Sequence, residues 1–128
     1  MKEPYKEALR YIRNAEELLA SKAGRENGVY IDRKYVRMAG NTAWNGVLIA
    51  IGGWLEGMNI KYSGKTRPSE KWYEKEISKR NRKLNTHFTN AYDILHKSMG
   101  YDGVLLASIS KEGLKVAHEI IILCNRHS

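Results

Sequence analysis

Residues with little or no side chain recur between residues 32 and 59, and no other feature of the sequence constrains the fold as much. They alternate between spacings of four and three residues, the repeat of one helical face: Ala39, Ala43, Gly46, Ala50, Gly53 and Gly57. Glycine inside a helix costs about 0.5 to 1 kcal/mol relative to alanine, so these glycines indicate compensation by close packing. We expect another helix of the same chain to pack against this face; a subunit interface is the alternative.

The same segment is apolar around much of its circumference. A second series of larger apolar residues lies beside the small ones: Trp44, Leu48, Ile51, Leu55 and Met58. A helix that is apolar on two adjoining faces is expected at the centre of a bundle or between the subunits of a dimer. Asp32 is suited to cap the first turn of this helix.

Helical periodicity extends over the rest of the chain. One apolar stripe predicts a helix from about residue 4 to residue 22: Tyr5, Ala8, Ile12, Ala15 and Leu19. Residues 23–31 and 60–67 are expected to be connectors, and no strand is predicted. A third helix is expected from Pro68 to about Met99, and a short helix followed by a longer one after Asp102. A chain of 128 residues suits one hydrophobic core.

The predicted fold class is therefore all-α. We expect an up-and-down bundle of four main helices plus a short extra helix before the last, in a single domain that spans residues 1–128.

Charge and hydropathy predict a cytoplasmic protein. Charged residues interrupt the first twenty positions, which leaves no apolar run for a signal peptide. The most apolar stretch, from Ala43 to Leu55, has 13 residues, whereas a membrane-spanning helix needs about 20. No membrane association is therefore expected. The single cysteine, Cys124, lies in an apolar segment and is expected to be a buried thiol in a reducing compartment.

Positive charge is concentrated in one part of the chain. The formal net charge is +8, and residues 61–83 hold nine basic residues against three acidic ones. This segment is where an anionic partner such as RNA or a nucleotide is expected to bind, because cations hold phosphates and aromatic rings stack on bases. The predicted nucleic-acid-binding residues are Lys71, Trp72, Lys75, Lys79, Arg82 and Lys83. A solvated helix face, stabilised by pairs of lysine and glutamate, is the alternative.

The densest cluster, KRNRKLNTHF at residues 79–88, suggests a pair of reactive side chains. On a continuous helix Arg80 and His87 would lie on nearly the same face, about 20° apart around the helix axis and about 10 Å apart along it. A histidine that titrates near neutral pH can transfer protons, and a guanidinium can hold a phosphate by two hydrogen bonds. The alternative is a partly buried histidine with an ordinary hydrogen bond and a solvated arginine.

The chain resembles the HEPN superfamily of small all-α domains in two respects. The segment YVRMAGNTAWNGVLIAIGGWL is similar to the long second helix of such domains, and Arg80, Asn81 and His87 match the signature R-x(4–6)-H, with a polar residue after the arginine. The resemblance implies metal-independent RNA cleavage, in which His87 assists proton transfer, Arg80 binds the phosphate and Asn81 orients the pair. It also implies a homodimer.

The sequence leaves two function classes open. One is an HEPN-like protein that binds RNA or another phosphate-bearing ligand and is a candidate metal-independent endoribonuclease. The other is a non-enzymatic module that interacts with a protein partner in a bacterial complex. Neither needs a cofactor or a metal, since the four histidines form no zinc motif and no glycine-rich phosphate loop occurs.

Overall fold

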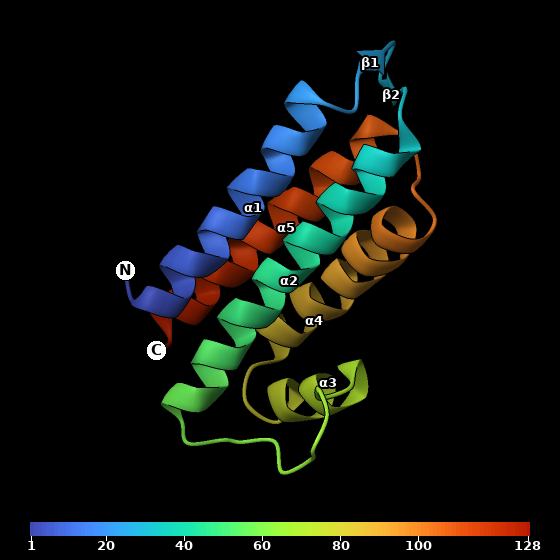
Figure 1. Ribbon diagram of the computed structural model, residues 1–128. Helices are drawn as coiled ribbons and strands as arrows, with labels where there is room; N and C mark the ends of the chain where they lie inside the picture. Colours follow the sequence, from blue (N-terminus) through green and yellow to red (C-terminus); the bar gives the residue numbers. More distant parts are fainter.

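Four long helical stretches run alternately up and down the molecule, and a short helix lies across one end (Figure 1). The computed structural model describes residues 1–128. Its elements are α1 (Glu3–Ser21), β1 (Arg25–Glu26), β2 (Val29–Tyr30), α2 (Arg33–Gly57), α3 (Glu70–Ser78), α4 (Arg82–Ala91), the π-helix η1 (Tyr92–Tyr101) and α5 (Ala107–Arg126). The predicted all-α bundle is confirmed. The first two helices begin and end within two residues of the predicted positions.

The face of small residues on α2 packs against α1, as expected for a close helix pair within the chain. A Cβ atom on Gly46 would lie 3.0 Å from the main-chain oxygen of Ala8 and 3.0 Å from Cδ1 of Ile12. One on Gly53 would lie 2.5 Å from Cβ of Pro4. The glycines therefore allow contact between the two helices, and this face no longer supports a subunit interface.

The opposite side of α2 packs against η1 and satisfies the end of that helix. A Cβ atom on Gly40 would lie 2.5 Å from Cβ of Met99, so the two backbones approach closely. Three polar side chains at successive turns of α2 donate hydrogen bonds to main-chain oxygens of residues 100–102: Arg33, Arg37 and Asn41. The last carbonyl groups of a helix lack partners within the helix, so these side chains stabilise the end of η1.

The single helix predicted from Pro68 to Met99 is wrong, because the chain turns between α3 and α4. Asn81 has an extended backbone, with φ −151° and ψ 102°, and its Oδ1 accepts a hydrogen bond from the main-chain nitrogen of Leu84 at 2.9 Å. Asparagine favours this N-cap position because its side chain replaces a missing helical partner. Ser69, rather than Pro68, caps α3. The continuous helix that would carry Arg80 and His87 on one face therefore does not exist.

The last helix also differs from the prediction, because α5 is one uninterrupted helix of 20 residues. Gly113 lies within it, where a Cβ atom would come within 2.6 Å of Ile94. Close packing on η1 explains the glycine at this position. The short extra helix is α3, which precedes the third long helix and not the last one.

The connector at residues 23–31 contains a two-stranded antiparallel hairpin that was not expected. Asn27 and Gly28 form its turn with positive φ angles of 52° and 77°. An Asn-Gly turn with this geometry matches the twist of a β-hairpin. The hairpin is attached to the start of α5, since the main-chain nitrogen of Ala107 donates to the oxygen of Gly28 at 2.9 Å.

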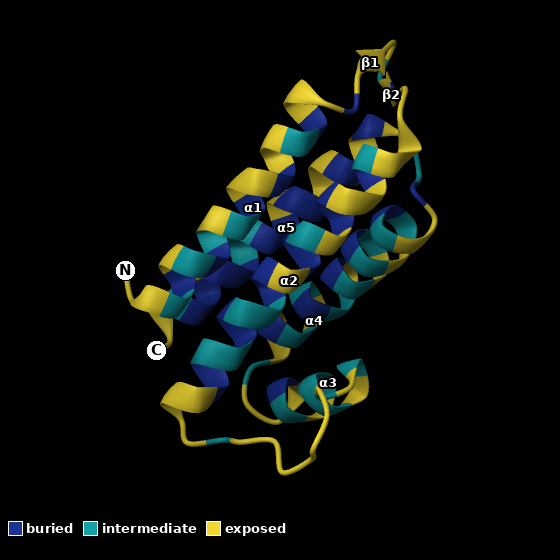
Figure 2. Cartoon of the chain, viewed as in Figure 1, coloured by how far each residue is buried: buried dark blue, intermediate teal, exposed yellow.

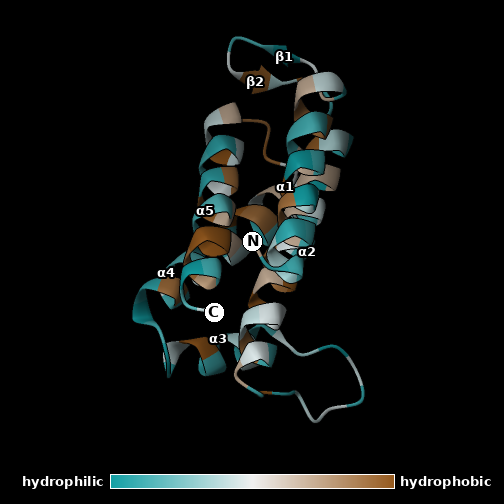
Figure 3. Ribbon diagram, turned by 90° about the vertical axis from the view of Figure 1, so that its left-hand side faces the viewer, coloured by the Kyte–Doolittle hydropathy of each residue, from teal (hydrophilic) through white to brown (hydrophobic).

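A cluster of 30 buried hydrophobic residues occupies the centre of the bundle, and every helix contributes to it. Burial is greatest where the helices face one another, whereas the hairpin and the chain before α3 are mostly exposed (Figure 2). In the side view, hydrophobic residues lie mainly on helix faces that point towards one another, and β2 is hydrophobic as well (Figure 3). Cys124 is buried, as predicted, and burial raises the pKa of its thiol to about 12. None of the helices is sufficiently long and apolar to span a membrane.

Candidate nucleic-acid interface

Arg80 lies in the turn between α3 and α4 and is bound to α3. Its Nη1 donates a hydrogen bond to the main-chain oxygen of Glu76 at 2.7 Å and lies 3.4 Å from the Glu76 carboxylate. The side chain is 31% exposed. The guanidinium is thus held at the end of α3.

His87 lies on α4 and contacts α5. Its Nε2 is 3.3 Å from Oε2 of Glu119, and its side chain is 18% exposed. The other ring nitrogen, Nδ1, is buried and has no hydrogen-bond partner. The imidazole is therefore partly buried between α4 and α5, which agrees with the more ordinary of the two interpretations drawn from the sequence.

The three residues of the HEPN-like signature do not meet in a pocket. Arg80 and His87 bind carboxylates on different helices, and Asn81 uses its side-chain oxygen to cap α4. None of the three lines any of five pockets on the surface. The interrupted helix places Arg80 in the turn after α3 and His87 on α4.

The predicted basic residues are exposed on α3, on α4 and in the turn between them. Lys79 shares the Glu76 carboxylate with Arg80, at 3.4 Å. The others form no ion pair: Lys71, Lys75, Arg82 and Lys83. Pairs with glutamate therefore account for little of this charge, and four cations are free to bind an anion.

Trp72 and Tyr73 belong to a continuous row of aromatic rings. Trp72 packs edge-on against Tyr62 at 5.2 Å and against Tyr73 at 5.3 Å, measured between ring centroids. The row continues through Phe88 to Trp44, with centroid distances of 5.9 and 5.4 Å. It thus crosses from the chain before α3 to the centre of α2.

The row ends in a pocket between α2, α3 and η1, which we call the aromatic pocket. Its volume is about 470 Å³, and its rings are those of Trp44, Tyr73, Tyr92 and His96. Tyr92 and His96 are stacked, with centroids 5.2 Å apart and an angle of 26° between the planes. Both come from η1.

Polar groups line the rest of the aromatic pocket: Asn41, Asn45, Arg67 and Glu70. Nη2 of Arg67 lies 3.5 Å from Oδ1 of Asn45. Burial raises the pKa of the Glu70 carboxyl group, and a hydrogen bond with Glu74 raises it further. The pocket therefore combines flat apolar surfaces with donors and acceptors, which suits a heteroaromatic ring.

Comparison with known proteins identifies the family. The family model of DUF5618, a domain of unknown function, matches residues 3–126. The chain belongs to the DUF5618 family. A protein of unknown function from Dyadobacter fermentans has a solved structure similar to this DUF5618 chain, with a TM-score of 0.90 and 38% sequence identity. The similarity covers 98% of this chain and 96% of that one. No curated protein matches the sequence.

The DUF5618 match gives the family and the solved structure supports the fold, while neither carries an activity. Neither links the chain to HEPN domains, so that resemblance stays a prediction. The structure has no group of three or more histidine, cysteine, aspartate or glutamate side chains placed to hold a metal ion.

Three residues of the aromatic pocket are not among the predicted site residues of this DUF5618 chain: Trp44, Tyr92 and His96. Trp44 lies on the predicted apolar face of α2, and His96 is one of the four histidines that form no zinc motif. Tyr92 and His96 are four residues apart, which was a signal for a shared helical face. Their meeting with Trp44 and Tyr73 depends on packing between three helices.

Proposed function

We propose that this protein binds RNA or another phosphate-bearing ligand, with a base in the aromatic pocket and phosphates on the cations of α3 and α4. One observation carries the proposal: the cation Arg67 lines the aromatic pocket together with Tyr73 of α3. Lys71 and Lys75 lie on the exposed face of α3, about 160° around the helix from Tyr73, where they can take phosphates further along a strand. Stacking rings combined with cations along the backbone hold a single strand.

The aromatic pocket suits a base because its rings offer flat faces and its amides offer polar edges. Stacking of a base on an aromatic side chain contributes about 1 to 3 kcal/mol. The side chains of Asn41 and Asn45 can each donate and accept hydrogen bonds. Arg67 lies at the same pocket and can neutralise a phosphate attached to the bound nucleoside.

The free cations suit the phosphates that follow along a strand. Each phosphate that they neutralise releases counterions, so binding should weaken as salt increases, with a slope of about −0.7 per phosphate for a single strand. The proposal thus includes a strong salt dependence, which a purely aromatic site would lack.

Binding without cleavage is the function that we propose. Cleavage through the HEPN-like signature would require Arg80 and His87 to reach the same phosphate. Glu76 on α3 holds the first and Glu119 on α5 holds the second, so both ion pairs would have to open. The proposal also includes two predictions from the sequence. The protein forms a homodimer, and it is located in the cytoplasm, where RNA is present.

The test is fluorescence anisotropy of a labelled, short single-stranded RNA at about 50 mM salt and at higher salt, in the presence of a chelator. The variants are Lys71→Ala with Lys75→Ala on α3, and Asn45→Asp in the pocket. Lys6→Ala with Arg13→Ala is the matched control, because both residues are exposed on α1 and form no ion pair. We expect the α3 pair to weaken binding about tenfold and to reduce the salt slope by about 1.4.

Two results would overturn the proposal. One is no RNA binding by the unmodified protein at low salt, which would favour the protein-interaction alternative. The other is an equal loss of affinity in the α1 control, which would indicate attraction by net charge alone. Gel analysis of the RNA after incubation tests cleavage separately, and we expect intact RNA.

A further inference from the structure

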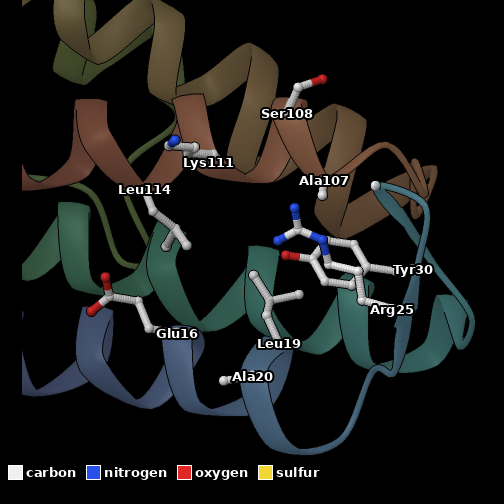
Figure 4. A pocket seen from close by; sticks show the side chains of 10 residues that line it. Glu16, Leu19, Ala20, Arg25, Tyr30, Ala107, Ser108, Lys111 and Leu114 are labelled. Carbon is white, nitrogen blue, oxygen red and sulfur yellow. The ribbon is translucent and has the colours of Figure 1, made fainter.

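A second pocket lies between α1 and α5, at the end of the bundle opposite α3 (Figures 1 and 4). The hairpin β1–β2 closes it, and we call it the hairpin pocket. Its volume is about 810 Å³, within the range of about 300 to 1,000 Å³ that is typical of sites for small molecules. None of the residues of the aromatic pocket lines it.

Tyr30 places an unpartnered hydroxyl group in the hairpin pocket. The residue is only 8% exposed and lines the pocket, and its hydroxyl oxygen is directed into the pocket, which Arg25 also lines (Figure 4). The main chain of Tyr30 is fixed, since its nitrogen donates to the oxygen of Leu105 at 2.8 Å. No protein group forms a hydrogen bond with the hydroxyl. Solvent reaches the hydroxyl oxygen through the pocket, so the group is free to donate a hydrogen bond to a bound anion.

The start of α5 offers further donors to the same space. The N-cap residue is Leu106, which has no side-chain oxygen to cap the helix. The main-chain N–H of Ser108 has no main-chain acceptor, and Ser108 lines the pocket, although its hydroxyl group points away from Tyr30 (Figure 4). Uncapped N–H groups and the helix dipole favour an anion at such a position.

Two cations border the hairpin pocket. Arg25 comes from β1 and Lys111 from α5, and neither forms an ion pair. Together with Tyr30 and Ser108 they provide donors from β1, β2 and α5 around the pocket. The arrangement suits a carboxylate or a phosphate group.

The remainder of the hairpin pocket is largely apolar. Leu19 and Leu114 face it from α1 and α5 (Figure 4). Beyond them lies Glu16, which pairs with His118 at 3.4 Å and would repel a second anionic group. A ligand with one anionic end and an apolar body matches the cationic and apolar parts of the pocket.

From these contacts we infer that the hairpin pocket binds a small organic anion, with its carboxylate or phosphate group at Arg25, Tyr30, Ser108 and Lys111 and its apolar body on Leu19 and Leu114. The site is separate from the proposed RNA surface, and its occupancy does not depend on that proposal.

Isothermal titration calorimetry of the full chain with octanoate, octyl phosphate and octanol tests the inference. We expect at least one of the two anions to bind about tenfold more tightly than octanol, and the better one identifies the preferred head group. Tyr30→Phe removes only the hydroxyl group, and Lys111→Gln removes a cation. Each should weaken binding of the anion about tenfold. Lys115→Gln, an exposed change one turn further along α5, is the control and should leave affinity unchanged.

Failure of both octanoate and octyl phosphate to bind would overturn the inference. Equal affinity for octanol and the anions would also overturn the inference, because it would indicate binding by an apolar surface alone. Equal affinities for Tyr30→Phe, Lys111→Gln and the control would exclude the assigned donors. Competition between octanoate and RNA would show that the pocket is not a separate site, whereas loss of RNA binding alone would leave the inference intact.

Discussion

Replacing Asn81 by alanine removes the side chain that begins α4, and the cost can be worked from the structure. The Asn81 Oδ1 accepts one hydrogen bond, 2.9 Å from the main-chain nitrogen of Leu84. Loss of such a cap lowers the free energy of unfolding by about 1 kcal/mol. Unfolding entropy of about 2.1 cal/mol/K per residue gives about 0.27 kcal/mol/K for 128 residues, so Tm should fall by about 4 °C.

Urea unfolding followed by circular dichroism, with thermal unfolding beside it, measures this change. Asn81→Asp keeps an acceptor at the cap and should lose less than about 0.5 kcal/mol. Asn90→Ala makes the same chemical change at an exposed position within α4 and should be neutral or slightly stabilising. If Asn81→Ala were as stable as the unmodified protein, the helix would not begin at this cap, and the break between α3 and α4 would need another explanation.

Two further predictions concern stability. Gly40→Ala should lower the free energy of unfolding by about 1 to 3 kcal/mol, since its Cβ would lie 2.5 Å from Cβ of Met99. Gly52 is on the same helix, but a Cβ atom there meets nothing within 4 Å. Gly52→Ala should therefore raise the free energy of unfolding by up to about 1 kcal/mol. Urea midpoints for the pair decide this, and changes of equal sign would contradict the packing of α2 on η1. Burial raises the pKa of Cys124 from 9.0 to about 12, so above pH 9 the unfolded chain holds fewer protons and stability should fall as pH rises. Urea midpoints across this range should show a steeper fall than in Cys124→Ala; equal slopes would refute the assignment.

Local periodicity was sufficient to predict α1 and α2. The stripe from Tyr5 to Leu19 repeats without interruption and is fully used in the core. The small residues of α2 likewise predicted a close neighbour, and Gly46 meets α1. Both patterns reflect the packing of α1 against the next helix, α2. Residues close together in the sequence were therefore enough to predict these two helices.

The break at Asn81 was missed because the surrounding residues are polar and basic, and an apolar stripe therefore gives no sign of where a helix ends. Asparagine is a frequent N-cap, and this was the available signal. The hairpin was missed although Asn27 and Gly28 form a common turn. In each case a side-chain or turn preference of one or two residues decided the structure.

Much of the candidate site could not be predicted, because it forms only through packing between distant segments. The sequence indicated the basic residues and Trp72, which are close together in the chain. The aromatic pocket joins Trp44, Tyr73 and His96 from three helices.

NMR spectra of isotopically labelled protein, titrated with a short single-stranded RNA at low salt, test the central claim most directly. We predict that signals of Trp72, Tyr73, Tyr92 and His96 and the side-chain amide of Asn45 shift together and saturate. Shifts confined to the hairpin end of the bundle, or no shifts at all, would contradict RNA binding at the aromatic pocket.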